Sequence, residues 1–190
     1  MVRGLEIGFL LDRQWYCMEG RRDQDKKPTL VVVARELFEA AVPYAVIGGV
    51  AMQVHCREPR ATLDIGVAVS ARERIPRDAL QRAGLRPTGS HAHSENWLNA
   101  DGTPVQFTDD PAFAAGIVGA IVRDLDGVPL RILPAVDMLH AKLRAGGDPA
   151  RRRSKRLQDL ADAEALLETD PGLVRELTAA EKALLDRLPQ

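Results

Sequence analysis

The chain has 190 residues, of which 45% are hydrophobic and 28% charged, and its 26 basic and 27 acidic side chains give a formal net charge of −1. A chain of this length buries roughly 70% of its extended surface, so it needs no disulfide or structural metal to fold. The balanced charge excludes a general attraction to nucleic acid or to an anionic membrane. No stretch approaches the roughly 20 apolar residues of a membrane span. We expect a cytoplasmic protein without a membrane partner.

Residues 1–28 show no core pattern, because the sequence EGRRDQDKKP at 19–28 is a solvated charged run that ends in proline. We predict a weakly structured arm or a loosely attached helix over 1–28. The remaining chain is expected to form a core over 29–133 and C-terminal helices packed on that core over 134–190.

From residue 29 the pattern is helical, with Thr29 as the expected N-cap. The apolar stripe of this helix consists of Leu30, Val33, Ala34, Leu37, Phe38 and Ala41. A short buried strand at 44–47 is predicted to end at Gly48 and Gly49, followed by a helix over 50–57. A strand over 62–69 and a helix over 73–83 come next.

Two hairpins are predicted after residue 93, each turning at an Asp-Gly dipeptide, at 101–102 and at 126–127. Helices are expected over 134–145 and 157–168, and Asp170 followed by proline starts a last helical segment. Thr178 and Glu181 have the spacing of a capping box. The order predicts an α+β fold: a small mixed β-sheet with packed helices and a C-terminal helical segment.

The stretch RATLDIGVAV, residues 60–69, contains a candidate metal-binding carboxylate, Asp64. Side chains alternate between the two faces of a strand, so Asp64 and Gly66 are expected to point the same way. Two carboxylates at this spacing commonly hold metal ions at the edge of a sheet. Here one carboxylate is present, and the other position has no side chain.

Five segments in this order resemble the polymerase-β-like nucleotidyltransferases, in particular a small bacterial branch that includes abortive-infection, toxin-type enzymes. They are IGGVAMQVH (47–55), RATLDIGVAV (60–69), GTPVQFTDD (102–110), VPLRILPAVDMLHAKLRA (128–145) and KRLQDLADAEALL (155–167). The resemblance spans about residues 29–168. It implies a nucleotidyltransferase fold and a nucleoside triphosphate as ligand.

The resemblance also implies a role for each matching residue. Gly48 and Gly49 would let a triphosphate approach the backbone at a helix start, which agrees with the chemistry of such turns. Arg60, Thr62 and Lys155 would take part in binding the nucleotide.

Asp64 would be the first metal ligand and a catalytic residue. Lys142 and Asp159 would complete the catalytic set by arranging the phosphates and the acceptor.

The chain departs from the family at two of its three carboxylates, where Gly66 and Gln106 stand instead. Two-metal transfer needs carboxylates that hold the ions about 3.5–4 Å apart. Glycine supplies no ligand, and a neutral amide binds a hard cation weakly. We expect weak Mg²⁺ binding at Asp64 and lost or strongly impaired transfer.

Plainer interpretations remain open for each site residue. The Gly-Gly pair also fits a tight strand-to-helix turn, Lys142 an exposed helix lysine, and Asp159 an ordinary surface residue. His91 and His93 are expected in an exposed loop, although such a pair can bind metal.

Three functions are therefore consistent with the sequence. The first is a nucleotide-binding protein with little or no transfer. The second is an active nucleotidyltransferase that modifies an RNA, protein or small-molecule acceptor. The third is an interaction module of the toxin–antitoxin type that binds no nucleotide.

Overall fold

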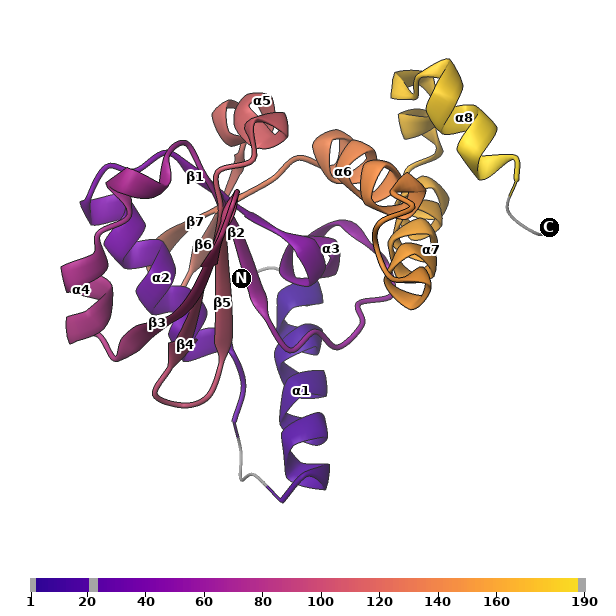
Figure 1. Cartoon of the computed structure of the whole chain (residues 1–190). Helices are drawn as coiled ribbons and strands as arrows, with labels where there is room; N and C mark the ends of the chain where they lie inside the picture. The colour runs from indigo at the N-terminus through magenta and orange to yellow at the C-terminus, as the bar shows by residue number, and fades with distance from the viewer. Residues whose placement is uncertain (1–2, 21–23, 188–190) are drawn as a thin grey trace.

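A computed structural model of the chain describes residues 3–20 and 24–187. Within these residues the strands form one seven-stranded mixed sheet in the order β3-β4-β5-β2-β1-β7-β6 (Figure 1). The strands are β1 (Tyr44–Ile47), β2 (Ile65–Val69), β3 (Leu85–His91), β4 (Ser94–Asn99), β5 (Pro104–Thr108), β6 (Ile121–Leu125) and β7 (Val128–Ile132). The expected class, a mixed sheet with packed helices, is confirmed.

Helices cover both faces of the sheet. In Figure 1, α2 and α4 lie on one side, and α1, α3, α6 and α7 lie on the other. The α-helices are α1 (Arg3–Met18), α2 (Lys27–Glu39), α3 (Gly48–His55), α4 (Arg77–Arg82), α5 (Ala114–Val118), α6 (Ala135–Gly147), α7 (Arg153–Thr169) and α8 (Ala179–Leu185). Short 3-10 helices cover Arg72–Arg74, Pro111–Phe113 and Pro171–Glu176. No helix in the described ranges is long and apolar enough to cross a membrane.

The strand pairing fixes the centre of the sheet. β2 is antiparallel to β1 and parallel to β5, and Gly66 lies opposite Ile47 on one side and Gln106 on the other. Gln106 therefore lies on the strand directly beside Gly66. The strand itself begins only at Ile65, so Asp64 directly precedes β2 instead of lying within it.

Both predicted hairpins are confirmed: β4 pairs with β5, and β6 pairs with β7, each in antiparallel register. The sequence did not predict β3, whose side chains are exposed after Leu85. An exposed edge strand of this kind shows little hydrophobic alternation, which is the main signal of a strand in a sequence. His91 ends this strand and is exposed.

Of the two alternatives predicted for residues 1–28, a weakly structured arm and a loosely attached helix, the described part forms a helix, and this helix is packed on the core instead of loosely attached. Residues Arg3–Met18 form a helix, and Leu5, Phe9 and Tyr16 on one of its faces are buried. Leu5 and Phe9 join the core cluster, and α1 packs against α3. The apolar face of α1 was missed because charged residues interrupt its short hydrophobic run. Residues 1–2 and 21–23 of the predicted arm lie outside the described residues.

The first core helix also differs from its prediction at both ends. α2 begins at Lys27 with Pro28 in its first turn, so Thr29 is not the N-cap. The Thr29 hydroxyl instead donates to Asp101 at 2.8 Å. Four residues of the predicted stripe are buried, namely Leu30, Val33, Ala34 and Leu37. Phe38 is exposed, and Ala41 lies beyond the helix with a positive φ of 50°.

Candidate functional site

The turn between β1 and α3 is built for close approach of the backbone. Gly48 has a φ of +67°, a conformation that other residues adopt at a cost. A Cβ at Gly49 would lie 2.3 Å from Thr62 Oγ1, so a side chain there would displace the segment that leads to β2. No side chain caps the first turn of α3, which follows Ile47. Uncapped N–H groups at a helix start attract anions.

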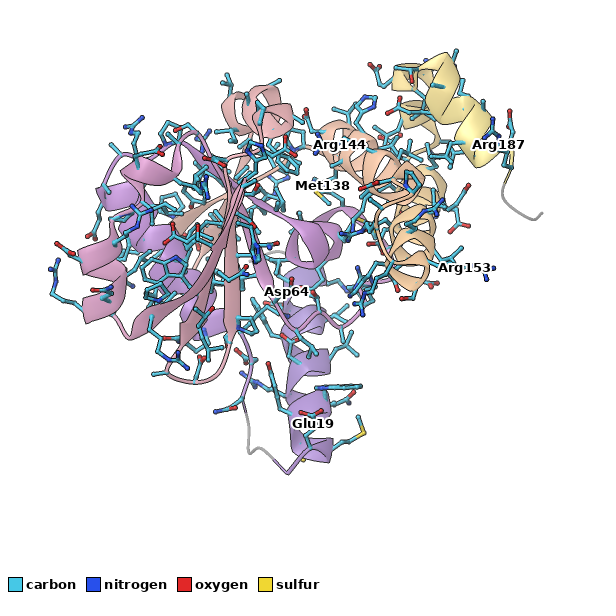
Figure 2. The ribbon with its side chains drawn as sticks, viewed as in Figure 1. Glu19, Asp64, Met138, Arg144, Arg153 and Arg187 are labelled. Atoms are coloured by element: carbon cyan, nitrogen blue, oxygen red, sulfur yellow. The ribbon has the colours of Figure 1, made fainter. Side chains whose placement is uncertain are left out.

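A pocket of about 320 Å³ opens beside this turn. Its walls come from β1, β4, β5, α6 and α7 and from the loops that join them. The lining residues are Ile47, Gly48, Ser94, Gln106, Thr108, Asp110, Phe113, Met138, Ala141, Lys142, Ala145, Arg151 and Asp159. Four of the positions singled out in the sequence thus meet in one pocket. Figure 2 shows Met138 on the side of α6 that faces the sheet.

Charged side chains form a continuous chain of ion pairs at the wall made by α6 and α7. Lys142 Nζ lies 2.9 Å from Asp159 Oδ1 and 2.7 Å from Asp162 Oδ2. Arg151 Nε lies 2.7 Å from Asp159 Oδ2. Arg60 meets Asp162 with two bonds, of 2.9 Å from Nε and 2.8 Å from Nη2. We call these five residues the charge ladder: three cations joined by two carboxylates.

The ladder corrects two of the plainer interpretations. The side chain of Lys142 is 11% exposed and that of Asp159 is 6% exposed, so neither is an ordinary surface residue. Burial of the Asp162 carboxyl opposes its ionisation, but the Arg60 hydrogen bonds and the Lys142 charge outweigh this cost and lower its pKa below the usual range. The same hydrogen bonds raise the pKa of Arg60. The pair of Arg60 and Asp162 is therefore charged at neutral pH.

Asp64 lies outside this pocket. It is exposed just before β2, and Thr62 Oγ1 donates to its Oδ1 at 3.1 Å. Asp64 and Gln106 together line a second hollow of about 400 Å³ on the β3-β4-β5 part of the sheet. Gln106 Nε2 donates to Asn96 Oδ1 at 3.2 Å. Gln106 is thus shared by both hollows and links the pocket to the side of the sheet where Asp64 lies.

The possible metal ligands around Asp64 and Gln106 do not fit a site that holds two metal ions. Asp64 is the single carboxylate that lines the second hollow, and Gln106 offers a neutral amide. A Cβ at Gly66 would lie 3.0 Å from Ile47 Cγ1, so a second carboxylate at this position would be crowded by the Ile47 side chain. Among residues 3–20 and 24–187 no three or more His, Cys, Asp or Glu side chains are grouped so that they could hold a metal ion.

The other predicted nucleotide-binding residues lie farther from the pocket. Arg60 and Thr62 lie in the segment before β2, where they contact Asp162 and Asp64. Lys155 is exposed in the first turn of α7 and does not line the pocket. Sequence reasoning missed Asp162. Its place three residues after Asp159 on a helix was the available signal, because side chains at this spacing share a face.

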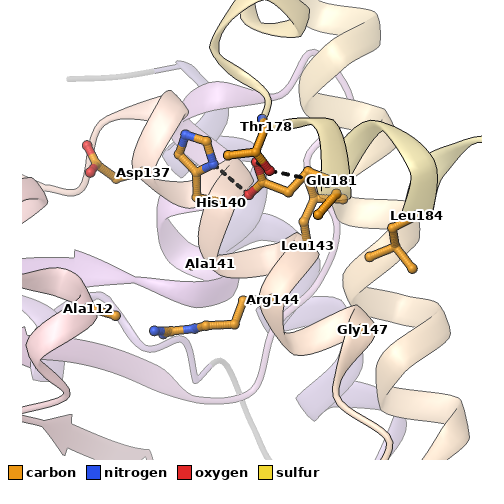
Figure 3. Close-up of a pocket in the computed structure, with 11 residues that line it drawn as sticks. Ala112, Asp137, His140, Ala141, Leu143, Arg144, Gly147, Thr178, Glu181 and Leu184 are labelled. Atoms are coloured by element: carbon orange, nitrogen blue, oxygen red, sulfur yellow. Dashed lines mark hydrogen bonds and ion pairs between the residues drawn. The ribbon is translucent and has the colours of Figure 1, made fainter.

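A larger cavity of about 490 Å³ lies on another side of α6, next to α8 (Figure 3). His140 Nδ1 lies 2.7 Å from Glu181 Oε1, and Thr178 donates to Glu181 Oε2 from both its amide and its hydroxyl. The predicted capping box of Thr178 and Glu181 is therefore confirmed. Burial of Glu181 is outweighed by these hydrogen bonds, which lower its pKa. The contacts fasten α8 to α6.

Comparison with known proteins gives matches among solved structures. No family model matches the chain, and no curated protein matches it. The crystal structure of ANT(2″)-Ia in complex with adenylyl-2″-tobramycin has a TM-score of 0.57 and 15% identity, over 83% of this chain and 98% of that one. JHP933 from Helicobacter pylori has a TM-score of 0.54 and 16% identity, over 84% of this chain and 70% of that one.

A third similar structure is the Megavirus polyadenylate synthase, with a TM-score of 0.52 and 14% identity. The match covers 77% of this chain and 32% of the synthase. At these identities the likeness shows the fold alone. The chain has the fold of the nucleotidyltransferase-like proteins, as the sequence motifs implied.

Proposed function

We propose that this protein binds a nucleoside triphosphate in the 320 Å³ pocket and transfers nucleotide poorly or not at all. One observation carries the proposal: the fold brings Gly48, Gln106, Lys142 and Asp159 together in one pocket. These positions are far apart in the chain and were singled out from sequence motifs alone. The pocket volume lies at the low end of the range for small-molecule sites, about 300–1,000 Å³.

Phosphate groups are attracted here by groups that need no metal ion. The uncapped N–H groups at the start of α3 offer hydrogen bonds, and Lys142 and Arg151 offer positive charge in the pocket wall. Asp159 neutralises part of that charge, so we expect modest affinity.

Impaired transfer follows from the missing ligands. Nucleotidyl transfer draws on metal ions or cationic side chains to stabilise the charge that develops at the reacting phosphate. Asp64 alone is poorly suited to hold two ions, and Gly66 and Gln106 supply no carboxylate. We expect Mg²⁺ to bind weakly at Asp64, with the nucleotide phosphates as further ligands. By its motifs we place the protein beside the small bacterial toxin-type branch.

Calorimetric titration with ATP and GTP in EDTA tests the proposal. We expect weak binding without any divalent ion, and weaker binding at high salt, because exposed charges are screened within about 8 Å at physiological ionic strength. Lys142→Ala is expected to reduce the affinity, whereas Lys182→Ala on α8 serves as a matched control outside the pocket. Asp64→Ala is expected to leave binding unchanged or to strengthen it slightly, because a carboxylate without a cation repels phosphate.

Other outcomes would select the other functions. Strict Mg²⁺ dependence that Asp64→Ala abolishes, together with transfer of labelled nucleotide to an RNA, protein or small-molecule acceptor, would show an active enzyme. If millimolar nucleotide produces no detectable heat and no competition, nucleotide binding is contradicted. That result would favour an interaction module.

A further inference from the structure

Asp162 is the most fully bonded carboxylate near the pocket, although it does not line the pocket. Its side chain is 4% exposed, accepts hydrogen bonds from Arg60 and Gln158, and forms an ion pair with Lys142. The bond from Gln158 Nε2 measures 3.0 Å. A buried carboxylate with this many donors is held in one geometry, because moving it would leave several polar groups unpaired.

The two cations that Asp162 holds belong to different parts of the candidate site. Lys142 stands in the wall of the nucleotide pocket on α6. Arg60 stands in the segment that carries Thr62 and Asp64 to the start of β2. The Arg60 carbonyl also accepts a bond of 2.8 Å from Gln53 Nε2 on α3, so the segment is fixed from α3 and from α7.

We propose that Asp162 is a positioning residue: through Lys142 it holds the phosphate-binding ammonium at the pocket wall, and through Arg60 it holds the segment that presents Asp64. The inference rests on the proposed nucleotide binding. Asp159 is expected to have a different role. It lies in the pocket wall and competes with phosphate for Lys142 and Arg151, whereas Asp162 approaches Lys142 from outside the pocket.

The direction in which ATP affinity changes when Asp162 is replaced distinguishes a positioning role from a simple effect of its charge. Removing a negative charge near a triphosphate strengthens binding through electrostatics alone. Losing one of the two carboxylates that hold Lys142 weakens binding, because an ammonium held by Asp159 alone is less ordered before phosphate arrives. A purely structural role would lower the melting temperature and leave the affinity of the folded protein unchanged.

The experiment measures ATP affinity in EDTA for wild type, Asp162→Ala, Asp162→Asn and Glu168→Gln, well below each melting temperature. We expect Asp162→Ala to bind about tenfold more weakly, the loss of a hydrogen bond between charged groups. Asp162→Asn keeps part of the bonding and is expected to fall between Asp162→Ala and wild type. Glu168→Gln removes an exposed carboxylate of the same helix and is expected to match wild type.

A second readout concerns the segment before β2. The Arg60 Nε–H resonance, assigned by its absence in Arg60→Lys, is expected to shift and to exchange faster with water in Asp162→Asn. If Asp162→Ala does not fold, Asp162→Asn carries both measurements. Equal or tighter ATP binding by the Asp162 variants, or an unchanged Arg60 resonance, overturns the inference while the proposed function stands. A wild-type protein that binds no ATP overturns the proposed function, and the inference with it.

Discussion

At the scale of single residues, Gly66 and Gln106 lie opposite each other on two neighbouring strands at the centre of the sheet. Gly66 lies between Ile47 and Gln106 in neighbouring strands, and none of the three supplies a carboxylate. A Cβ at Gly66 would lie 3.0 Å from Ile47 Cγ1, so a carboxylate placed there would crowd the neighbouring strand as well as change the local charge.

Restoring the carboxylates tests this view. Gly66→Asp with Gln106→Asp is expected to raise Mg²⁺-dependent nucleotide binding, and Gly66→Asp alone to raise it less, because the second ion stays weakly held. Since a new Cβ would lie 3.0 Å from Ile47 Cγ1, adding Ile47→Ala, which removes that atom, should enlarge the effect of the pair. The measurement is ATP titration with and without Mg²⁺. Unchanged Mg²⁺ dependence in all variants would show that the pocket has been remodelled beyond its former use.

The sequence identified the residue types of the site but not their partners. Lys142 and Asp159 were recognised through their motifs, although a helix lysine is usually exposed. Only the packing of α6 against α7 shows that their side chains are buried and paired. Asp162 has no motif of its own, and its importance comes from Arg60, about a hundred residues earlier in the chain.

At the scale of elements, α1 is joined to α2 by a buried ion pair. Asp12 on α1 bonds to Lys26 at the start of α2, and each side chain is 1% exposed. Burial raises the pKa of Asp12 and lowers the pKa of Lys26, and their mutual attraction opposes both shifts. A buried pair of this kind is costly to break, because the remaining charge has no partner.

Single and double substitutions separate the cost of the broken pair from the value of the pair itself. Asp12→Ala or Lys26→Ala is expected to lower the free energy of unfolding by about 3–5 kcal/mol. Asp12→Leu with Lys26→Met is expected to stay close to wild type, because no charge is left unpaired. Urea unfolding followed by circular dichroism measures both. A single variant as stable as wild type would mean that α1 contributes little to the fold.

The elements with strong local signals were predicted well. The Asp-Gly turns, the helix over α6 and the capping box of α8 depend on neighbouring residues, and each is confirmed. Elements whose signal comes from distant contacts were not. β3 has an exposed edge, and α1 needs the surface of α3 to make its apolar face visible as a core face.

At the scale of the whole molecule, buried titratable groups make stability depend on pH. Burial lowers the pKa of His55 despite its bond with the Leu133 carbonyl, and the pKa values of Asp162 and Glu181 are also lowered. A group whose pKa is lower in the folded state adds stability above its unfolded pKa, and this stability is lost as the pH falls through its folded value.

We therefore expect two acid steps in the free energy of unfolding. The first begins below pH ~6.5, where His55 titrates in the unfolded chain, and the second below pH ~4, where the carboxylates titrate. Asp12, with its raised pKa, opposes the second step in part. Urea unfolding from pH 8 to pH 3 measures the profile. His55→Gln should remove the first step and Asp162→Asn should reduce the second. A flat profile down to pH 4 would contradict the assignment of His55.

The sequence by itself determined the class of the fold, the order of the core elements and the presence of Gly66 and Gln106 instead of carboxylates at two positions. These follow from local periodicity, from turn chemistry and from residue identity at motif positions, none of which needs distant contacts. Only the tertiary structure decided that α1 belongs to the core and that Ile47 occupies the space beside Gly66. It also decided that Lys142 shares its charge with Asp159 and Asp162, because pairing between buried side chains is set by how helices and strands pack together.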